Sequence, residues 1–131
     1  MFDISICERR MIVLVRFSGR LAEDDFAELD KLASRARTSN VSFDSIFDMS
    51  AVEHVELAAQ FVASRGELPQ AYKDRRRLYV VPQDDLKLLV RLYATYQANK
   101  GWRAPEIVPT LDEAFASFDV SANDFRPWPT D

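Results

Sequence analysis

Three short apolar segments, each followed by a segment with helical periodicity, constrain this chain most strongly. Residues 11–15 and 78–81 are continuously apolar, and residues 43–47 are apolar at three of their five positions. A continuously apolar strand is typical of a sheet that is covered on both faces. Because helices separate these strands, we expect them to pair in parallel through right-handed crossovers. The pattern therefore predicts an α/β fold with a mostly parallel sheet.

Other local signals complete the order β-β-α-β-α-β-α-β-α. Residues 2–7 alternate between apolar and polar side chains, and only a short connection separates them from the next strand. We therefore expect them to form one antiparallel edge strand. Gly19 is expected to end the second strand. About four helices are expected, at residues 23–37, 55–66 and 85–100 and after a capping box of Thr110 and Glu113, with a short strand at 106–108.

Length, charge and cysteine content narrow the class of protein. The chain has 131 residues and a formal net charge of −4, so we expect one domain at 1–120, an irregular tail at 121–131, and no nucleic-acid partner. Every apolar run is far shorter than the roughly 20 residues of a membrane helix, so no membrane span is expected, and no secretion signal is visible. The single cysteine, Cys7, is predicted on the polar face of the first strand and indicates a reducing, cytoplasmic setting.

The residues that usually carry catalysis form no recognisable constellation. A Gly-rich phosphate loop, a nucleophile–base pair and zinc-ligand spacing are all missing from the sequence. His54 is the only histidine and has no ligand partners at a suitable spacing. Lys73 and residues 75–77 form a basic cluster, which we expect to be solvated at a strand entrance. We therefore expect a protein that is not an enzyme, with no catalytic residues, no cofactor and no metal.

The stretch from Phe43 to Gln60 is the predicted functional region. Its strand is expected to break at Asp48-Met49-Ser50, and a polar segment then leads to a helix that begins at residues 55–57. A loop at the carboxyl end of a parallel strand is where α/β proteins usually meet ligands and partners. Asp48 and Ser50 are expected to shape the turn, because Asp and Ser side chains bond to nearby backbone groups.

The element order and this stretch resemble the STAS domain of bacterial anti-sigma-factor antagonists, particularly the SpoIIAA-like group. Residues 48–52, Asp-Met-Ser-Ala-Val, match the Asp-Leu-Ser-Gly-Val signature that ends a strand in that family. Residues 56–59, Glu-Leu-Ala-Ala, fall on a second signature, Asp-Ser-Ser-Gly, where the family's kinase phosphorylates a serine. Ala58 stands at that position and carries no hydroxyl. Ser50 is left as an alternative site, although a serine there is more often a turn former.

The resemblance implies a cytoplasmic, non-enzymatic regulatory or protein-interaction module that is not controlled by the usual serine phosphorylation. Its unidentified protein partner would meet a loop and the adjoining helix start. In this interpretation Glu56 charges the helix N-terminus, and His54 and Leu57 are exposed contacts. The predicted partner-binding loop comprises Asp48, Ser50, His54, Glu56, Leu57 and Ala58.

The helix predicted at 85–100 carries more apolar surface than one sheet needs. Its apolar side chains cover an arc of about 240°, whereas a stripe of about 100–140° suffices to cover a sheet. Leu88, Leu92 and Tyr96 form the surplus stripe. Its cover would be either the tail, through Phe125 and Trp128, or a second copy of the chain in a homodimer.

An alternative function is a small-molecule or lipid-binding module. The ligand would lie between the carboxyl edge of the sheet and the long helix, against Tyr93, Tyr96 and Trp102. An apolar pocket of roughly 300 Å³ or more would favour this alternative, and a flat loop surface would favour the protein-interaction module.

Overall fold

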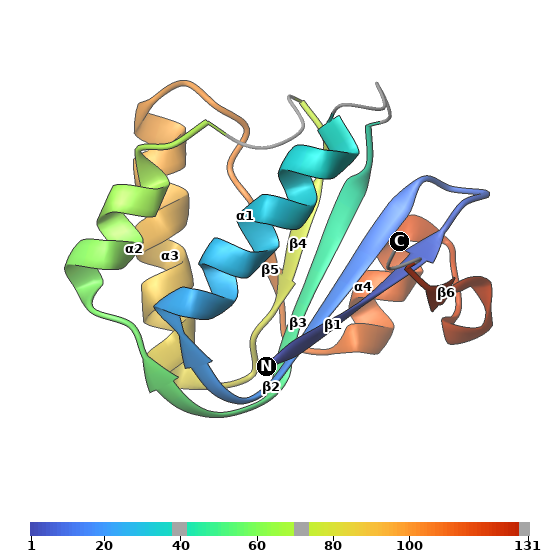
Figure 1. The fold of residues 1–131 in the computed structure, drawn as a ribbon, viewed down its shortest axis with the longest axis horizontal. Coiled ribbons are helices and arrows are strands. Elements are labelled where there is room, and N and C mark those ends of the chain that lie inside the picture. The colour runs from blue at the N-terminus through green and yellow to red at the C-terminus, as the bar shows by residue number, and fades with distance from the viewer. Residues whose placement is uncertain (38–41, 70–73, 129–131) are drawn as a thin grey trace.

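The structure is a computed structural model that describes residues 1–37, 42–69 and 74–128 (Figure 1). Its elements are β1 (Phe2–Cys7), β2 (Ile12–Ala22), α1 (Glu23–Arg37), β3 (Asp44–Glu56), α2 (Ala59–Gly66), β4 (Arg77–Val80), α3 (Asp84–Asn99), β5 (Glu106–Val108), α4 (Leu111–Phe118), the 3-10 helix η1 (Ala122–Asp124) and β6 (Arg126–Pro127). This order confirms the predicted α/β arrangement. The tail differs from the prediction, because part of it forms η1 and β6 instead of an irregular segment.

The strands form one six-stranded sheet in the order β5-β4-β3-β2-β1-β6. The pairs β2–β3, β3–β4 and β4–β5 are parallel, which confirms the predicted mostly parallel sheet. β1 is antiparallel to β2 as expected, but it is not the outermost strand, because β6 pairs antiparallel with it. The backbone N–H of Trp128 donates to the carbonyl of Ile4 at 2.9 Å and holds the tail along β1.

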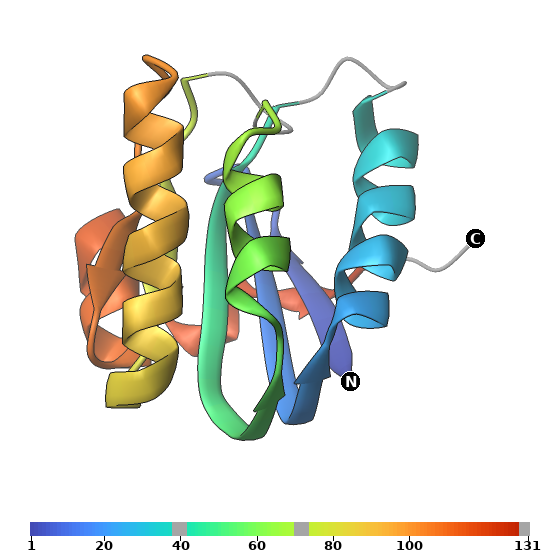
Figure 2. The same ribbon diagram turned by 90° about the vertical axis from the view of Figure 1, so that its left-hand side faces the viewer.

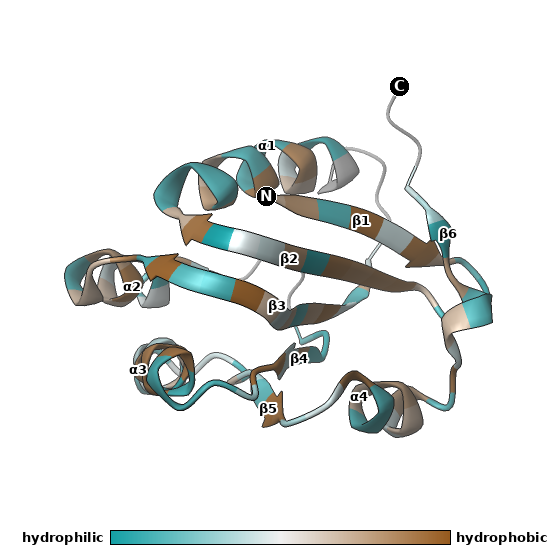
Figure 3. Cartoon of the chain, turned by 90° about the horizontal axis from the view of Figure 1, so that it is seen from below, coloured by the Kyte–Doolittle hydropathy of each residue, from teal (hydrophilic) through white to brown (hydrophobic). Residues whose placement is uncertain are grey.

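Helices cover both faces of the sheet. α1, α2 and α3 lie over one face, and α4 lies over the other (Figure 2, Figure 3). Leu14 and Leu78 point into the core on the α4 side. Their chain neighbours Val15 and Tyr79 point into the core under α1, α2 and α3. Because successive residues of a strand point to opposite faces, this arrangement accounts for the continuously apolar runs.

Cys7 corrects the prediction of a polar face on β1. Its side chain is only 1% exposed and belongs to the core on the α4 side. The prediction treated β1 as an edge strand with one open face, whereas α4 and the following tail cover that face. The thiol therefore packs as an ordinary core residue.

The central strands β2 and β3 are longer than predicted. β2 continues through Gly19, and β3 continues through Asp48, so neither strand ends where the sequence signals placed its end. The β2–β3 register shifts between Arg16 and Ser18 and again after Gly19, which has a φ of 66°. Such bulges bend a strand pair without ending it. The final parts of β2 and β3 consequently curl under the helices (Figure 1).

The ends of α3 and α4 lie close to their predicted positions. Gln83 is the N-cap of α3, one residue before the predicted cap. Gly101 follows the C-cap Lys100 with a φ of 78°, as expected for a residue that ends a helix in the left-handed region. Thr110 accepts a hydrogen bond from the backbone N–H of Glu113 at 3.2 Å, as the capping box predicts.

Candidate functional site

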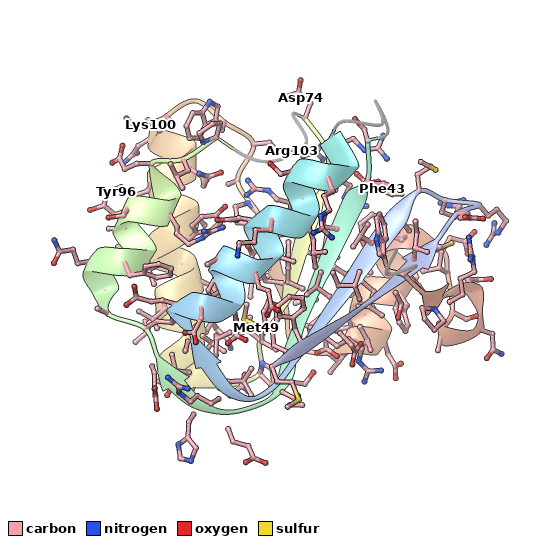
Figure 4. The ribbon with its side chains drawn as sticks, viewed as in Figure 1. Phe43, Met49, Asp74, Tyr96, Lys100 and Arg103 are labelled. Carbon is pink, nitrogen blue, oxygen red and sulfur yellow. The ribbon has the colours of Figure 1, made fainter. Side chains whose placement is uncertain are left out.

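A cavity of about 460 Å³ lies between the sheet and the helices α1, α2 and α3. Strands β1 to β4 form its floor, and the three helices form its walls. Along the start of β3 and the residue before it, the cavity extends from Phe43 to Met49, which lie well apart in Figure 4. Apolar side chains dominate the lining and include Val15, Leu21, Phe26, Leu29, Phe61, Leu86 and Val90. Its volume falls in the range of about 300–1,000 Å³ that is usual for ligand pockets.

The cavity exists because the three helices are unevenly spaced. α2 and α3 form a close pair, in which a Cβ at position 66 would lie only 2.4 Å from the Cβ of Tyr96. Gly66 therefore allows the two helices to touch. α1 lies on the other side of α2 from α3 (Figure 2), and its C-terminal end diverges from the pair (Figure 1).

Aromatic and charged side chains connect α1 with α2 across the cavity. The rings of Phe26 and Phe61 lie 5.9 Å apart between centroids. The guanidinium of Arg65 donates two hydrogen bonds of 2.9 Å to the carboxylate of Asp30 and lies 5.1 Å from the centre of the Phe26 ring. Burial works against the charged form of Arg65, but Asp30 outweighs it, so the pKa of Arg65 is raised.

The floor of the cavity changes from polar to apolar along the strands. In one rung of the sheet, Ser45 is the partner of Arg77, and both line the cavity. Two residues further along, Val15, Phe47 and Tyr79 are partners in the next rung on this face. The Phe47 and Tyr79 rings stack with their centroids 4.7 Å apart. The start of the parallel strands therefore forms the polar end of the cavity.

Arg77 is the most deeply placed charged group of the lining. It is 8% exposed, and its guanidinium donates to the Tyr93 hydroxyl at 2.7 Å, the Gln97 side-chain oxygen at 3.0 Å and the Arg103 carbonyl at 2.6 Å. The fully buried Gln97 in turn donates to the carbonyls of Gly66 and Leu68 at 2.8 Å each. This network connects β4, α3 and the end of α2.

Two tyrosines accompany the arginines at the cavity wall. Tyr79 and Tyr93 have ring centroids 6.1 Å apart. Burial raises the pKa of Tyr79, with a smaller contribution from Tyr93, while the positive charges of Arg77 and Arg65 act in the opposite direction. The Tyr79 phenol therefore stays neutral near physiological pH. Two guanidinium groups and two phenols thus share one region of the cavity.

The basic cluster is more tightly paired than predicted. Arg75 lies 3.2 Å from the carboxylate of Asp44. Arg76 donates to both carboxylate oxygens of Glu106, at 3.0 and 3.1 Å. Arg77 is buried in the network described above. The prediction of a solvated cluster is therefore wrong for Arg77, which is buried, whereas Arg75 and Arg76 are ion-paired and partly exposed. Lys73 lies outside the described residues.

The predicted partner-binding loop is part of a strand. Asp48 is 4% exposed, within β3, and its carboxylate lies 3.4 Å from Nε of Arg16. The backbone N–H of Ser50 donates to the same carboxylate at 3.0 Å, and the Ser50 hydroxyl bonds to it as well. Asp48 and Ser50 therefore shape a bulge in a continuing strand, not the turn that was predicted.

The other residues of the predicted loop are divided between two environments. His54 and Glu56 are exposed on the curled end of β3, and Glu56 pairs with Arg20 of β2. Ala58 is the exposed N-cap of α2. Leu57 is half-buried and lines the cavity, which the sequence analysis did not foresee. The six residues therefore do not form one surface loop, and their role in partner binding stays a prediction.

The surplus stripe on α3 is only partly covered. Leu88 is 65% exposed, while Leu92 and Tyr96 are half-buried. The tail does not supply the cover that was predicted, because the Trp128 ring packs on Phe43 and the Phe125 ring packs on Phe115 of α4. Instead, α2 covers part of the stripe at Tyr96, and a homodimer stays a prediction.

The alternative ligand site is only partly where it was predicted. Tyr93 lines the cavity, whereas Tyr96 and Trp102 are not among its lining residues. The cavity extends over the face of the sheet instead of only its carboxyl edge. Sequence reasoning also missed Arg65 and Arg77, although one signal was present. Tyr93 and Gln97 are four residues apart in a helix, which places two polar groups on one face.

Two classes of site are not found in the part of the chain that the structure describes. No group of three or more His, Cys, Asp and Glu side chains is placed to hold a metal ion in residues 1–37, 42–69 and 74–128. Within the same ranges, no helix has the length and apolar character needed to cross a membrane.

Comparisons with known proteins identify the fold. No family model matches the chain, and no curated protein matches it by sequence. A solved structure of the anti-sigma factor antagonist SpoIIAA in its unphosphorylated form matches with a TM-score of 0.62 at 12% identity, covering 89% of this chain and 96% of that one. The chain has a SpoIIAA-like fold. An uncharacterized protein of the DUF3478 family from Shewanella loihica PV-4, also with a SpoIIAA-like fold, matches with a TM-score of 0.57 at 14% identity, covering 90% and 92%.

Proposed function

We propose that this SpoIIAA-like protein is a binding module that holds a small molecule with a substantial apolar part in the cavity between α1 and the α2–α3 pair. The observation that carries this proposal is the volume of about 460 Å³ beneath a predominantly apolar lining. It exceeds the volume at which the sequence analysis would favour ligand binding over a flat interaction surface. An apolar wall without neighbouring atoms loses dispersion contacts, which a ligand would restore.

The first test is native mass spectrometry of the freshly purified protein, followed by thermal unfolding in the presence of decanol. We expect either a co-purified small molecule or a rise in Tm with decanol, since a ligand that binds only the folded state stabilises it. Ala33 lines the cavity on α1, and A33F should abolish the rise by filling the space. Ala27, exposed on the same helix, provides the matched control A27F. No bound molecule, together with no Tm shift with decanol, decanoate or decylamine, would rule out the proposal.

A second candidate function is recognition of a protein partner by the curled end of β2 and β3. This candidate is favoured by the exposure of Ser50, His54 and Glu56 on one strand segment, in a fold shared with an anti-sigma factor antagonist. On the sequence resemblance, Ala58 is the residue expected at the position of the phosphorylated serine, and this module would then bind its partner without that switch. Affinity capture from source cells with the parent protein and with H54A/E56A tests it. A partner retained equally by both proteins would contradict this surface.

A further inference from the structure

We propose that the cavity selects an anionic amphiphile, with its acidic head group at Arg65 and Arg77 and its apolar part toward Met49 and Leu86. This inference rests on the proposed ligand-binding function and adds the chemical class of the ligand. It depends on three features of the cavity: its charge, the position of its polar groups, and the direction of its apolar lining.

The charged groups of the lining are predominantly cationic. Arg65, Arg75 and Arg77 line the cavity, and Asp30 is the one carboxylate among its lining residues in the described part of the chain. Asp30 and Arg65 form an ion pair with each other. Asp44 pairs with Arg75 from outside the lining. The lining arginines therefore outnumber the lining carboxylate. This excess of positive charge would attract an anion, whereas it would give an uncharged apolar ligand no comparable attraction.

The polar groups converge on one region. Arg77 donates to the Tyr93 hydroxyl at 2.7 Å, and Tyr93 and Tyr79 lie side by side. The charges of both Arg65 and Arg77 act on the Tyr79 phenol, so both guanidinium groups lie near it. Arg65 already gives two parallel hydrogen bonds to Asp30, and both terminal nitrogens of Arg77 already donate within the protein, so an acidic head group would replace some of these acceptors. Phenol hydroxyls supply further donors to the same head group.

The apolar lining begins where this polar region ends. Arg77 and Ser45 belong to the rung near the start of the parallel strands, and the Arg103 carbonyl that accepts from Arg77 marks the same end. Arg103 and Phe43 lie at that end in Figure 4, and Met49 lies toward the other. The lining near Met49 includes Leu21, Leu57, Phe61 and Leu86. A chain-like apolar group would therefore extend from the head group toward the carboxyl end of β3.

The binding assay uses Trp128, which lines the cavity, as a fluorescent reporter in a W102F protein. The matched control is W128F, whose remaining Trp102 is outside the lining and should not respond. Decanoate, decanol and decylamine provide the same apolar chain with an anionic, a neutral and a cationic head. We expect decanoate to bind at least about tenfold more tightly than decanol, the factor that one charge-assisted hydrogen bond can supply. Decylamine should bind most weakly.

Two substitutions assign the head-group site. R77Q should weaken decanoate binding by at least about tenfold and leave decanol binding nearly unchanged. D30N removes the carboxylate that competes for Arg65 and should strengthen decanoate binding by about two- to fivefold. Because Asp30 is exposed, the D30N protein should fold, and it tests the head-group site even if the R77Q protein does not fold. The exposed Glu28 on the same helix provides the control E28Q, which changes the charge equally but should not alter binding.

Each outcome distinguishes this inference from the function on which it rests. Equal affinity for decanoate and decanol, or a preference for decylamine, would overturn the anionic ligand and leave the apolar-ligand function standing. Binding of acetate or inorganic phosphate as tight as that of decanoate would show an anion site without a role for the apolar lining, and would also overturn the inference. Absence of binding by all three decyl probes would remove the proposed function itself.

Discussion

The two faces of this sheet are covered in different ways, although the same strands supply both. On one face, α4 places Ala114, Phe115 and Phe118 directly against the strands, and all three are buried. On the other face, three helices cover a larger area and leave a cavity of about 460 Å³. The difference in packing between the two faces therefore comes from the arrangement of the helices and not from the strands.

This contrast suggests that the two faces contribute differently: close packing on one face stabilises the fold, and the cavity on the other leaves space for the proposed ligand. Close-packed interiors are stabilised by contacts on every side and tolerate little change in volume. The α4 face is close-packed in this way, whereas the opposite face has fewer packing contacts around its cavity. On this face α1 meets α2 through the ion pair of Arg65 and Asp30 and the ring contact of Phe26 and Phe61, and the cavity remains beneath these contacts. We interpret the α4 face as the support for the fold and the opposite face as the side of the proposed ligand site.

The largest expected effect compares one aromatic truncation on each face. Phe115→Ala on the α4 face should lower the free energy of unfolding by about 3–5 kcal/mol, because it opens a void in a close-packed core. Phe61→Ala, at the half-buried rim of the cavity, should cost less than about 2 kcal/mol, because less surrounding packing is lost. Urea denaturation at neutral pH measures both values. Equal losses would contradict the distinction between the faces.

A smaller effect is expected where α2 meets α3. Gly66→Ala should destabilise the protein by about 1–3 kcal/mol, because its Cβ would lie 2.4 Å from the Cβ of Tyr96. The sign is informative, since Gly→Ala at an unstrained helical position normally stabilises. Ser64→Ala, at an exposed position of the same helix, serves as the control and should change stability little. A neutral or stabilising Gly66→Ala would mean that α2 and α3 are not closely paired.

Filling the cavity should have the opposite sign. Ala33→Phe should raise the free energy of unfolding by about 0.5–2 kcal/mol, the usual gain from filling a void. The same substitution on the α4 face, at Ala114, should destabilise, because that residue is fully buried in a packed core. Thermal and urea unfolding of the two variants test the contrast directly. A destabilised Ala33→Phe protein would indicate that the helices already close the space.

Much of the fold could be predicted from the sequence, because the decisive signals are local. The continuously apolar residues of β2 and β4 require cover on both faces, and Gly101 and Thr110 mark helix ends through backbone geometry and capping. Asp48 and Ser50 misled the prediction for a physical reason. A side chain that bonds two residues along the backbone is compatible with a turn or with a bulge, and only the parallel pairing of β3 with β2 selects the bulge.

The candidate site could be predicted far less well. The cavity depends on how far α1 stands from α2, which no local pattern encodes. Arg65 and Asp30 are 35 residues apart in the chain, and their ion pair follows from the crossover that brings α2 beside α1. Arg77 looked like the end of a solvated basic run, because its acceptors Tyr93, Gln97 and Arg103 come from later in the chain. Of the three residues foreseen as ligand contacts, only Tyr93 lines the cavity.

The smallest expected effect concerns the anchoring of α1 on the loosely packed face. The Asp25 carboxylate accepts hydrogen bonds of 2.9 Å from the Met1 ammonium group and from the backbone N–H of Ala22. Burial of Asp25 acts to raise its pKa, but these two donors outweigh burial, and the pKa is lowered. Asp25→Asn should cost about 0.3–1 kcal/mol at pH 7, where the carboxylate also favours the helix N-terminus.

The pH dependence of this effect follows from the lowered pKa. A carboxylate whose pKa is lower in the folded than in the unfolded state stabilises the protein above the unfolded value near 3.9, and this contribution is lost as the pH falls through the folded value. The stability difference between the parent protein and Asp25→Asn should therefore be present at pH 7 and shrink on acidification. Urea denaturation across this range measures it, with Asp24→Asn, exposed in the same turn, as the control. A difference that persists unchanged in acid would mean that the charge of Asp25 does not hold α1 to the sheet. Other contacts would then have to fix the position of α1 relative to the other helices.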